Sequence, residues 1–343
     1  MFEEITITHD PADTKVALLA GGTSGEREIS LNSGKGALGA LSEAGYQVTQ
    51  LDPSNKEDLK VLIDGDFDVV FLALHGKGGE DGSMQGFLQT IGLPYTCSDV
   101  WGSAVSIDKT KAKVFYEKAG VPTPKSLVVT REGFFDKDAS VAEKSNQVGA
   151  LREQLHSKAA AITAELGQKV AVKAATEGSS IGVFIVEGTD AVAEALEEAL
   201  RIDDKVLLES YVAGREFTCV VGGSGEKAQA LPVIEIVPRN AFYDIESKYA
   251  PGGCQHICPA QITAQQTEAI QKYAVEAQRA LGVGGFARTD FLLDEQGNPW
   301  ALETNTIPGM TATSLLPDAA AAAGISFPQL VVLMIQMAMD DNN

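Results

Sequence analysis

Residues 286–305, FARTDFLLDEQGNPWALETN, decide the fold of the C-terminal part of this 343-residue chain. Two runs that alternate apolar and polar residues flank the turn-rich tetrapeptide EQGN, a pattern that predicts an antiparallel hairpin. Pairing about the middle of that tetrapeptide sets Asp290 opposite Glu303 and Arg288 opposite Asn305. Because side chains on a strand alternate between its two faces, all four are expected on one face of the hairpin.

This face of the hairpin has the donor atoms of a cation site. Two opposed carboxylates repel each other unless a cation lies between them. Oxygen ligands from Asp, Glu and Asn suit Mg²⁺, with phosphate oxygens completing the octahedron. We therefore predict a magnesium site at Asp290, Glu303 and Asn305. The alternative is a solvated face partly neutralised by Arg288, and a register slip of one residue would scatter the group.

Upstream of the hairpin, three apolar runs end in polar residues. VAVKAATEGSSIGV (170–183) delivers Lys173 and then a Gly/Ser loop, whose backbone amides could wrap phosphate oxygens. It fits neither the Walker A pattern nor the dinucleotide fingerprint.

Glu209 follows the apolar run 206–208 and could accept a hydrogen bond from an adenine amino group or a ribose hydroxyl; the alternative is an exposed acid. His75 lies where ligands bind in open α/β sheets, although a lone histidine is more often structural.

Composition excludes several classes of protein. The chain has 27 basic and 47 acidic residues, a formal net charge of −20, which argues against nucleic acid and anionic membranes as partners. The N-terminus lacks a signal-peptide pattern, and the apolar run 330–339 is too short to cross a bilayer. Four cysteines do not make a disulfide scaffold, so a cytoplasmic protein is expected. Cys254, His256 and Cys258 form at most half a zinc site, because a structural zinc needs four ligands.

Strands, glycine loops and helices alternate near the N-terminus, which predicts a parallel, doubly wound sheet. Length alone suggests roughly two domains, at about 150 residues each. The order of the segments favours three: an α/β domain over 1–106, a central domain over 107–203 and a C-terminal domain over 204–343 that carries the metal site. One helix is expected over 264–281 and another over 319–339.

Seven motifs, in this order along the chain, resemble the D-alanine–D-alanine ligase family, which has the ATP-grasp fold. They are GGTSGEREISLNSG (21–34), LALHGKGGEDGSMQGFLQTIGLPYT (72–96), SIDKTKAK (106–113), VKAATEGSSIGV (172–183), LLESYVAGREFT (207–218), FYDIESKY (242–249) and the segment 286–317 that includes the hairpin. The resemblance implies a three-domain α/β protein in which two α+β domains clamp ATP. It departs from the family at Cys97, where a turn loses the usual glycine.

The resemblance also implies the residues that bind ATP. Lys109 and Lys173 would contact its phosphates, Glu209 its adenine and Glu216 its ribose. The hinge residues beside the adenine would be Ser210, Tyr211 and Val212. Two Mg²⁺ ions, or Mn²⁺ in their place, would bind Asp290, Glu303 and Asn305.

The substrates implied by the resemblance are two D-alanine molecules. Glu26 would anchor the ammonium group of the first, with His75 beside it. Tyr249 would reach toward Glu26 and Ser179 and close a lid over 242–249. The carboxylate of the second D-alanine would be held by Lys248, Ser314 and the Leu315 amide. Arg288 and the Gly309 amide would form the oxyanion site.

The implied reaction is ATP-dependent formation of D-alanyl-D-alanine through an acyl phosphate, in a homodimeric enzyme that supplies peptidoglycan precursors. Three alternatives share parts of this pattern. The second substrate could be D-lactate or D-serine, but FYDIESKY keeps the tyrosine and lysine of the dipeptide type. A non-catalytic ATP-binding protein would be expected to lack Arg288 or the metal-binding residues. Ligation of L-amino acids by the same chemistry is the third.

Overall fold

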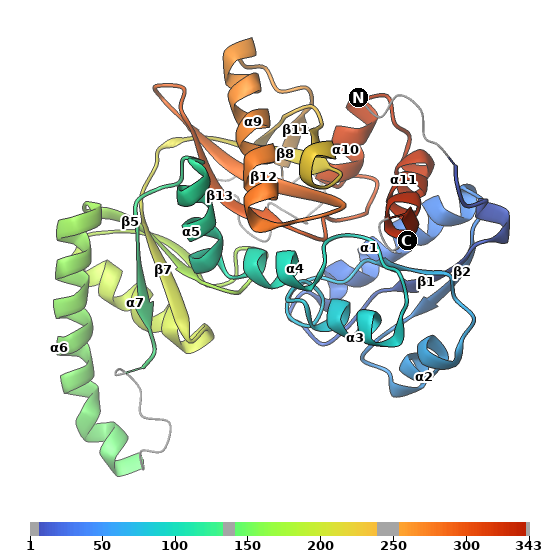
Figure 1. Cartoon of the computed structure of the whole chain (residues 1–343). Helices are drawn as coiled ribbons and strands as arrows, with labels where there is room; N and C mark the ends of the chain where they lie inside the picture. Colours follow the sequence, from blue (N-terminus) through green and yellow to red (C-terminus); the bar gives the residue numbers. More distant parts are fainter. Residues whose placement is uncertain (1–6, 133–140, 239–253, 341–343) are drawn as a thin grey trace.

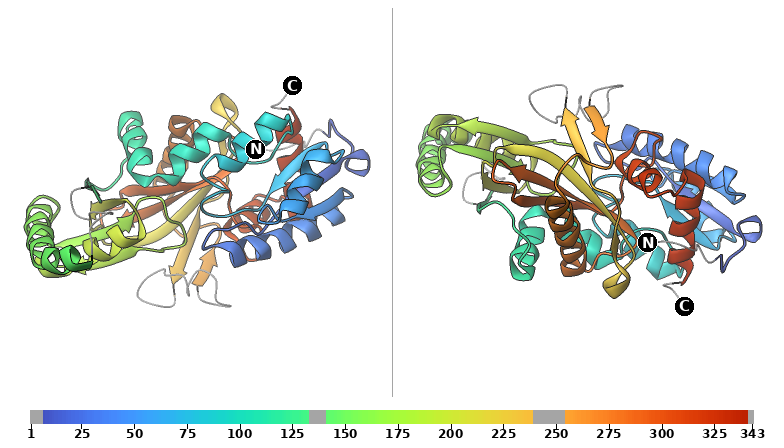
Figure 2. Two further views of the ribbon diagram at one scale, coloured as in Figure 1. Left: turned by 90° about the horizontal axis from the view of Figure 1, so that it is seen from below. Right: turned by 90° about the horizontal axis from the view of Figure 1, so that it is seen from above.

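The computed structural model describes residues 7–132, 141–238 and 254–340, with backbone alone over 141–151. Three sheets lie along the long axis of the molecule (Figure 1). Views from below and from above place the first sheet at one end, the four-stranded sheet at the other end and the largest sheet between them (Figure 2). This arrangement confirms the expected α/β fold class.

The first sheet is parallel, as expected, with strand order β2-β1-β3. Strands β1 and β3 are buried at almost every position, which is typical of a parallel sheet covered on both faces. Its strands are β1 (Lys15–Leu19), β2 (Gln47–Leu51) and β3 (Val69–Leu72). The helices of this part of the chain are α1 (Arg27–Glu43), α2 (Lys56–Asp64), α3 (Ser83–Ile91) and α4 (Val100–Ile107).

The four-stranded sheet is antiparallel, with order β4-β7-β5-β6. Its strands are β4 (Ser126–Thr130), β5 (Lys169–Ala174), β6 (Val183–Glu187) and β7 (Lys205–Ser210). Helices α6 (Val141–Leu166) and α7 (Thr189–Ile202) share one apolar core with it. Strand β7 lies beyond residue 203, where the predicted central domain ends, and the three domain boundaries stay a prediction.

The largest sheet has six strands in the order β11-β10-β8-β12-β13, with β9 paired to β8. They are β8 (Gly214–Gly222), β9 (Gln229–Ala230), β10 (Ile234–Pro238), β11 (Cys254–Ile257), β12 (Phe286–Asp294) and β13 (Pro299–Asn305). Helices α5 (Lys109–Ala119) and α9 (Ala264–Leu281) pack against this sheet in a common apolar core. Helix α9 has the predicted bounds, and Thr263 begins it with a capping box.

The end of the chain differs from the single helix expected over 319–339. It forms two helices, α10 (Leu315–Ala322) and α11 (Phe327–Asp340), bent by 102°. Gly324 lies between them with φ +82°, a left-handed conformation that favours glycine. Among the described residues no single helix could span a membrane; this bent pair passes by length and composition only.

The hairpin of β12 and β13 has the predicted register where it matters. Asp290 lies opposite Glu303, and Arg288 lies opposite Asn305. Nearer the turn the pairing is shifted by one residue, with Leu293 opposite Pro299. A β-bulge after Asp290 removes that shift, so the predicted pairs form although the turn is centred on residue 296 and not between 296 and 297.

The turn at Cys97, where the family usually has glycine, has the left-handed backbone conformation that favours glycine. Cys97 has φ +75° in this turn. A Cβ atom on Gly285, which faces the turn, would lie 3.0 Å from the Cys97 Cα atom. Glycine is therefore required at position 285, and Cys97 adopts a left-handed conformation that costs a non-glycine residue about 1 kcal/mol or more.

Candidate active site

A cavity of about 980 Å³ lies where the first sheet, the Gly/Ser loop after β5 and the hairpin meet. Many of the residues predicted from the sequence line it, although they come from widely separated segments. The predicted residues in its wall are Glu26, His75, Lys109, Ser179, Arg288, Glu303, Asn305, Gly309, Ser314 and Leu315.

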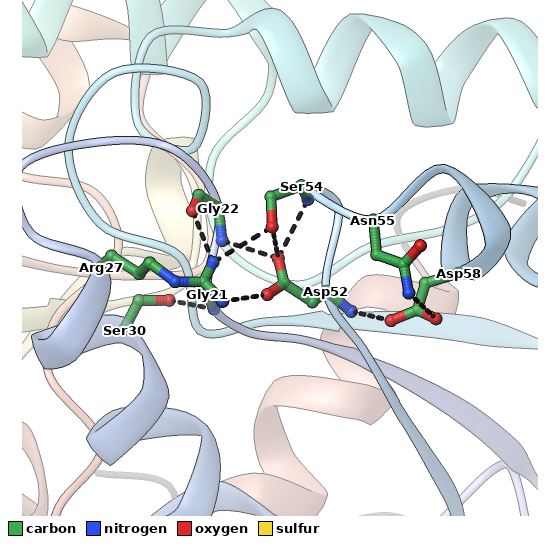
Figure 3. A network of polar contacts seen from close by, with 8 residues as sticks. All are labelled: Gly21, Gly22, Arg27, Ser30, Asp52, Ser54, Asn55 and Asp58. Atoms are coloured by element: carbon green, nitrogen blue, oxygen red, sulfur yellow. Dashed lines mark hydrogen bonds and ion pairs between the residues drawn. The ribbon is translucent and has the colours of Figure 1, made fainter.

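A polar network fixes the turn between β1 and α1, which leads to Glu26 (Figure 3). The Asp52 carboxylate accepts hydrogen bonds from the Gly22 N–H at 3.0 Å and from the Arg27 guanidinium at 2.6 Å. Burial acts to raise the pKa of Asp52, but these donors and Ser54 hold it well below its usual value. A Cβ on Gly21, whose φ is +105°, would lie 2.6 Å from this carboxylate, so only glycine fits.

The Gly/Ser loop after β5 reaches across to this turn. Ser179 donates a hydrogen bond to Glu26, which is 7% exposed. Ser179 has φ +50°, and a Cβ on Gly178 would lie 2.5 Å from the Glu26 carboxylate. A second link joins Lys77 Nζ to Glu177 Oε1 at 2.6 Å. The loop is thus held in a strained conformation against the residues that follow β1 and β3, a pattern common at ligand sites.

His75 follows β3 and is buried. Its Nε2 atom lies 2.9 Å from Ser33 Oγ, a contact with α1 that the sequence analysis did not predict. Burial, with a smaller contribution from the Arg288 charge, lowers the pKa of His75 from 6.5 to about 4. His75 is therefore neutral near pH 7.

On the hairpin face, the positively charged side chains of Arg288 and Lys109 pair with the carboxylates of the predicted metal ligands. The Arg288 guanidinium donates to both Asp290 oxygens, at 3.0 and 3.2 Å, and Lys109 Nζ lies 2.9 Å from Glu303. The Asn305 side-chain oxygen accepts from the Ile307 N–H at 3.0 Å. Two carboxylates and an amide oxygen on one face suit Mg²⁺. Within the described ranges no group of three His, Cys, Asp or Glu residues could hold a metal, so such an ion would depend on Asn305 and on ligand oxygens.

Glu80 is a cavity residue that the sequence analysis missed. Its carboxyl accepts a hydrogen bond from the Gly76 N–H at 2.6 Å. Burial, and then the nearby carboxylate of Glu26, raise the pKa of Glu80 to about 8. Its place after a strand and glycine loop, in HGKGGEDG, was the available signal, but its closeness to Glu26 depends on the fold.

The predicted adenine ligand, Glu209, lies at the end of β7 between two lysines. Lys113 Nζ is 2.6 Å from Oε1, and Lys173 Nζ is 2.5 Å from Oε2. Lys113 was not among the residues predicted from the sequence, although its i, i+4 spacing from Lys109 in SIDKTKAK places both on one helix face. Glu209 is therefore a buried acid, and the alternative that it is an exposed acid is wrong.

The predicted hinge follows Glu209 directly. The Ser210 hydroxyl donates to the Leu166 carbonyl at 2.9 Å, and Lys169 Nζ lies 3.9 Å from the centre of the Tyr211 ring. Val212 comes next in the connection to β8, and Glu216 lies half-buried on β8.

The predicted second-substrate residues lie at the start of α10. Ser314 precedes Leu315, the first residue of the helix, and its Oγ accepts from the Thr311 N–H at 3.0 Å. A Cβ on Gly309 would lie 2.9 Å from Ser314 Oγ, so the Gly309 backbone is close to this hydroxyl. Lys248, Tyr249 and the predicted lid over 242–249 lie outside the described residues.

The residues considered for zinc make other contacts. His256 Nδ1 lies 2.6 Å from Asp318 Oδ2, and its Nε2 atom lies 3.3 Å from Cys254 Sγ. No zinc-like group of ligands is found here among the described residues.

Comparison with known proteins gives consistent matches. The family model described as D-ala D-ala ligase C-terminus matches residues 147–336, and the one described as D-ala D-ala ligase N-terminus matches residues 53–98. D-alanine–D-alanine ligases from Halalkalibacterium halodurans and Moorella thermoacetica are 40% and 44% identical, over 95% of this chain and 99% of each relative. The solved structure of the Bacillus anthracis ligase complexed with ATP is 28% identical, with a TM-score of 0.76 over 96% of this chain and 98% of that one.

Proposed function

The chain belongs to the D-alanine–D-alanine ligase family, and from this we propose that it joins two D-alanine molecules at the expense of ATP. The products are D-alanyl-D-alanine, ADP and phosphate, and the dipeptide supplies peptidoglycan synthesis. The observation that carries the proposal is sequence identity of 40% or more over nearly the full length of named ligases. The cavity described above is lined by part of the residues that the proposal uses, among them Glu26, Lys109 and Arg288.

ATP is proposed to bind between the central and C-terminal domains. Glu209 and the hinge over 210–212 hold the adenine, and Glu216 holds the ribose. Lys109 and Lys173 bind the phosphates. Two Mg²⁺ ions held by Asp290, Glu303 and Asn305 would neutralise charge on the transferring phosphoryl group.

The first D-alanine is proposed to bind near α1. Glu26 holds its ammonium group, and Ser179 fixes the Glu26 carboxylate. Its carboxylate attacks the γ-phosphorus of ATP, the bond to ADP breaks, and an acyl phosphate forms. His75 is neutral at pH 7, so it adds no positive charge beside the first D-alanine.

The second D-alanine then attacks the acyl carbon with its free amine. Arg288 and the Gly309 amide stabilise the negative oxygen of the tetrahedral intermediate, which collapses with loss of phosphate. Ser314, the Leu315 amide and Lys248 hold the second carboxylate. Tyr249 and the lid over 242–249 exclude water, which would otherwise hydrolyse the acyl phosphate.

We further propose that the enzyme is a cytoplasmic homodimer. The support for a dimer is the resemblance to the family, and the support for the compartment is the requirement for ATP. Sedimentation of the purified protein tests the dimer.

Product identification tests the proposed reaction. The purified protein is incubated with ATP, Mg²⁺ and D-alanine, and the products are identified by mass spectrometry. Parallel reactions add D-lactate or D-serine, or replace D-alanine with L-alanine. We expect D-alanyl-D-alanine with one phosphate released per dipeptide. A main product containing D-lactate, D-serine or L-alanine, or no phosphate release at all, would contradict the proposal.

A further inference from the structure

A cluster of three charges, two of them buried, lies where α5, β5 and β7 meet, on the side of the site proposed to bind ATP. The two Glu209 oxygens are shared between Lys113, at 2.6 Å, and Lys173, at 2.5 Å. The side chains of Glu209 and Lys113 are only 2% and 3% exposed. A buried carboxylate keeps its charge only when opposite charges and hydrogen bonds compensate for the loss of water.

The lysines decide the protonation of this carboxylate. Burial acts to raise the pKa of Glu209, but the charges of Lys173 and Lys113 outweigh it and hold the pKa below its usual value. Tyr116 and Glu117, also on α5, are the further titratable groups that interact with this cluster. Removing both lysine charges would therefore favour the neutral acid.

The two lysines differ in how firmly they are held. Lys113 Nζ donates a second hydrogen bond to Thr123 Oγ1 at 2.6 Å, and that hydroxyl donates to the Ala301 carbonyl at 2.8 Å. Thr123 is flanked by two prolines, so this support is stiff. Lys173 is more exposed, at 12%, and lies at the end of β5, directly before the Gly/Ser loop.

ATP changes this arrangement. In the proposed function Lys173 binds phosphate oxygens, so its ammonium group must leave Glu209 when ATP enters. Lys113 is locked between Glu209 and Thr123 and has no such role. After ATP binds, Lys113 is the counter-charge of Glu209 that stays in place.

We infer that Lys113 is a positioning residue that keeps Glu209 ionised and aims its second oxygen at the adenine amino group once Lys173 has moved to the phosphates. This inference rests on the proposed function. An ionised carboxylate only accepts hydrogen bonds, so it matches the 6-amino group of adenine and repels the 6-carbonyl oxygen of guanine. A protonated Glu209 could donate to that carbonyl. Lys113 therefore sets the preference for ATP over GTP without touching the nucleotide.

The test replaces Lys113 with an uncharged side chain of similar length, Lys113→Met. The control is Lys111→Met, two residues away on α5 and exposed to solvent. Phosphate release with saturating D-alanine gives kcat and KM for ATP and for GTP. For Lys113→Met we expect KM for ATP to rise about tenfold or more and the ATP:GTP preference to fall about tenfold or more, with kcat changed far less. Raising the pH to about 9 should restore part of the preference as Glu209 ionises. Lys111→Met should match the unmodified enzyme.

A second variant covers the case in which Lys113→Met does not fold. Lys113→Met combined with Glu209→Gln buries a neutral pair, and it should lose the ATP preference similarly, because an amide both donates and accepts. A preference within about twofold of the unmodified enzyme, in whichever variant folds, would overturn the role of Lys113.

Nucleotide binding without D-alanine separates this inference from the proposed reaction. Calorimetric titration compares ATP with GTP for the unmodified protein and each folded variant. If the unmodified protein binds ATP but makes no dipeptide, the proposed reaction fails. Even then, unchanged relative binding of ATP and GTP in the variants would overturn the role of Lys113, and a fall in ATP preference would support it.

Discussion

The buried histidine predicts how stability depends on pH. In the folded protein the pKa of His75 is lowered from 6.5 to about 4, mainly by burial and further by the Arg288 charge. Between these values the unfolded chain binds a proton that the folded chain does not. The free energy of unfolding should therefore fall as the pH drops from about 6.5 toward 4. At neutral pH this contribution is fully present.

The size of the effect follows from the two pKa values. A tenfold difference in proton affinity is worth about 1.4 kcal/mol, so the whole effect amounts to about 3 kcal/mol. By pH 5 about 2 kcal/mol of it should already be lost. His75 is 6% exposed, so solvent screens little of this amount.

The assay is urea unfolding, followed by the fluorescence of the two tryptophans, from pH 7.5 to 5. His75→Gln removes the titrating ring and keeps a polar group that can bond to Ser33. The stability difference between the unmodified protein and this variant should shrink by about 2 kcal/mol over that range. A pH-independent difference for His75→Gln, or a His75 ring that titrates above pH 6 by NMR, would refute the reasoning.

Three further outcomes are expected. Arg288→Ala should lower kcat about 100-fold or more and change KM for ATP little, because Arg288 acts on charge that appears during the reaction; normal turnover would exclude that role. Glu303→Gln should raise the Mg²⁺ concentration for half-maximal activity about tenfold, and an unchanged titration would remove Glu303 from the metal site. Gly36→Ala should lower the free energy of unfolding by about 1–3 kcal/mol, because the added Cβ would lie 2.0 Å from the Met310 carbonyl oxygen. Gly39→Ala, on the same helix with nothing within 4 Å of its Cβ, should raise it by up to about 1 kcal/mol, and equal urea midpoints for the two would contradict this packing argument.

Much of the candidate site was predictable because its signals are local. Alternation and a turn-rich tetrapeptide placed Asp290 opposite Glu303, and the structure has that pair. The prediction succeeded although the pairing next to the turn is shifted by one residue, because a bulge after Asp290 compensates for the shift. The expected single helix at the end of the chain was wrong because the apolar pattern continues across Gly324, where the backbone turns.

Other properties of the site arise between segments far apart in the chain. Lys113 and Glu209 are separated by 96 residues, and only the packing of α5 against the sheets brings them together. The raised pKa of Glu80 and the lowered pKa of His75 likewise depend on burial and on neighbouring charges that no local pattern contains.

By itself, the sequence determined the kinds of element, the residues proposed to carry the chemistry and the family that they resemble. These depend on side-chain periodicity, turn residues and motif order, which are properties of neighbouring residues. Only the tertiary structure decided which charges meet, which are removed from water and which backbone turns accept a left-handed residue such as Cys97. Desolvation and Coulomb energies depend on distance in space, so they are settled only when the three sheets pack around one cavity.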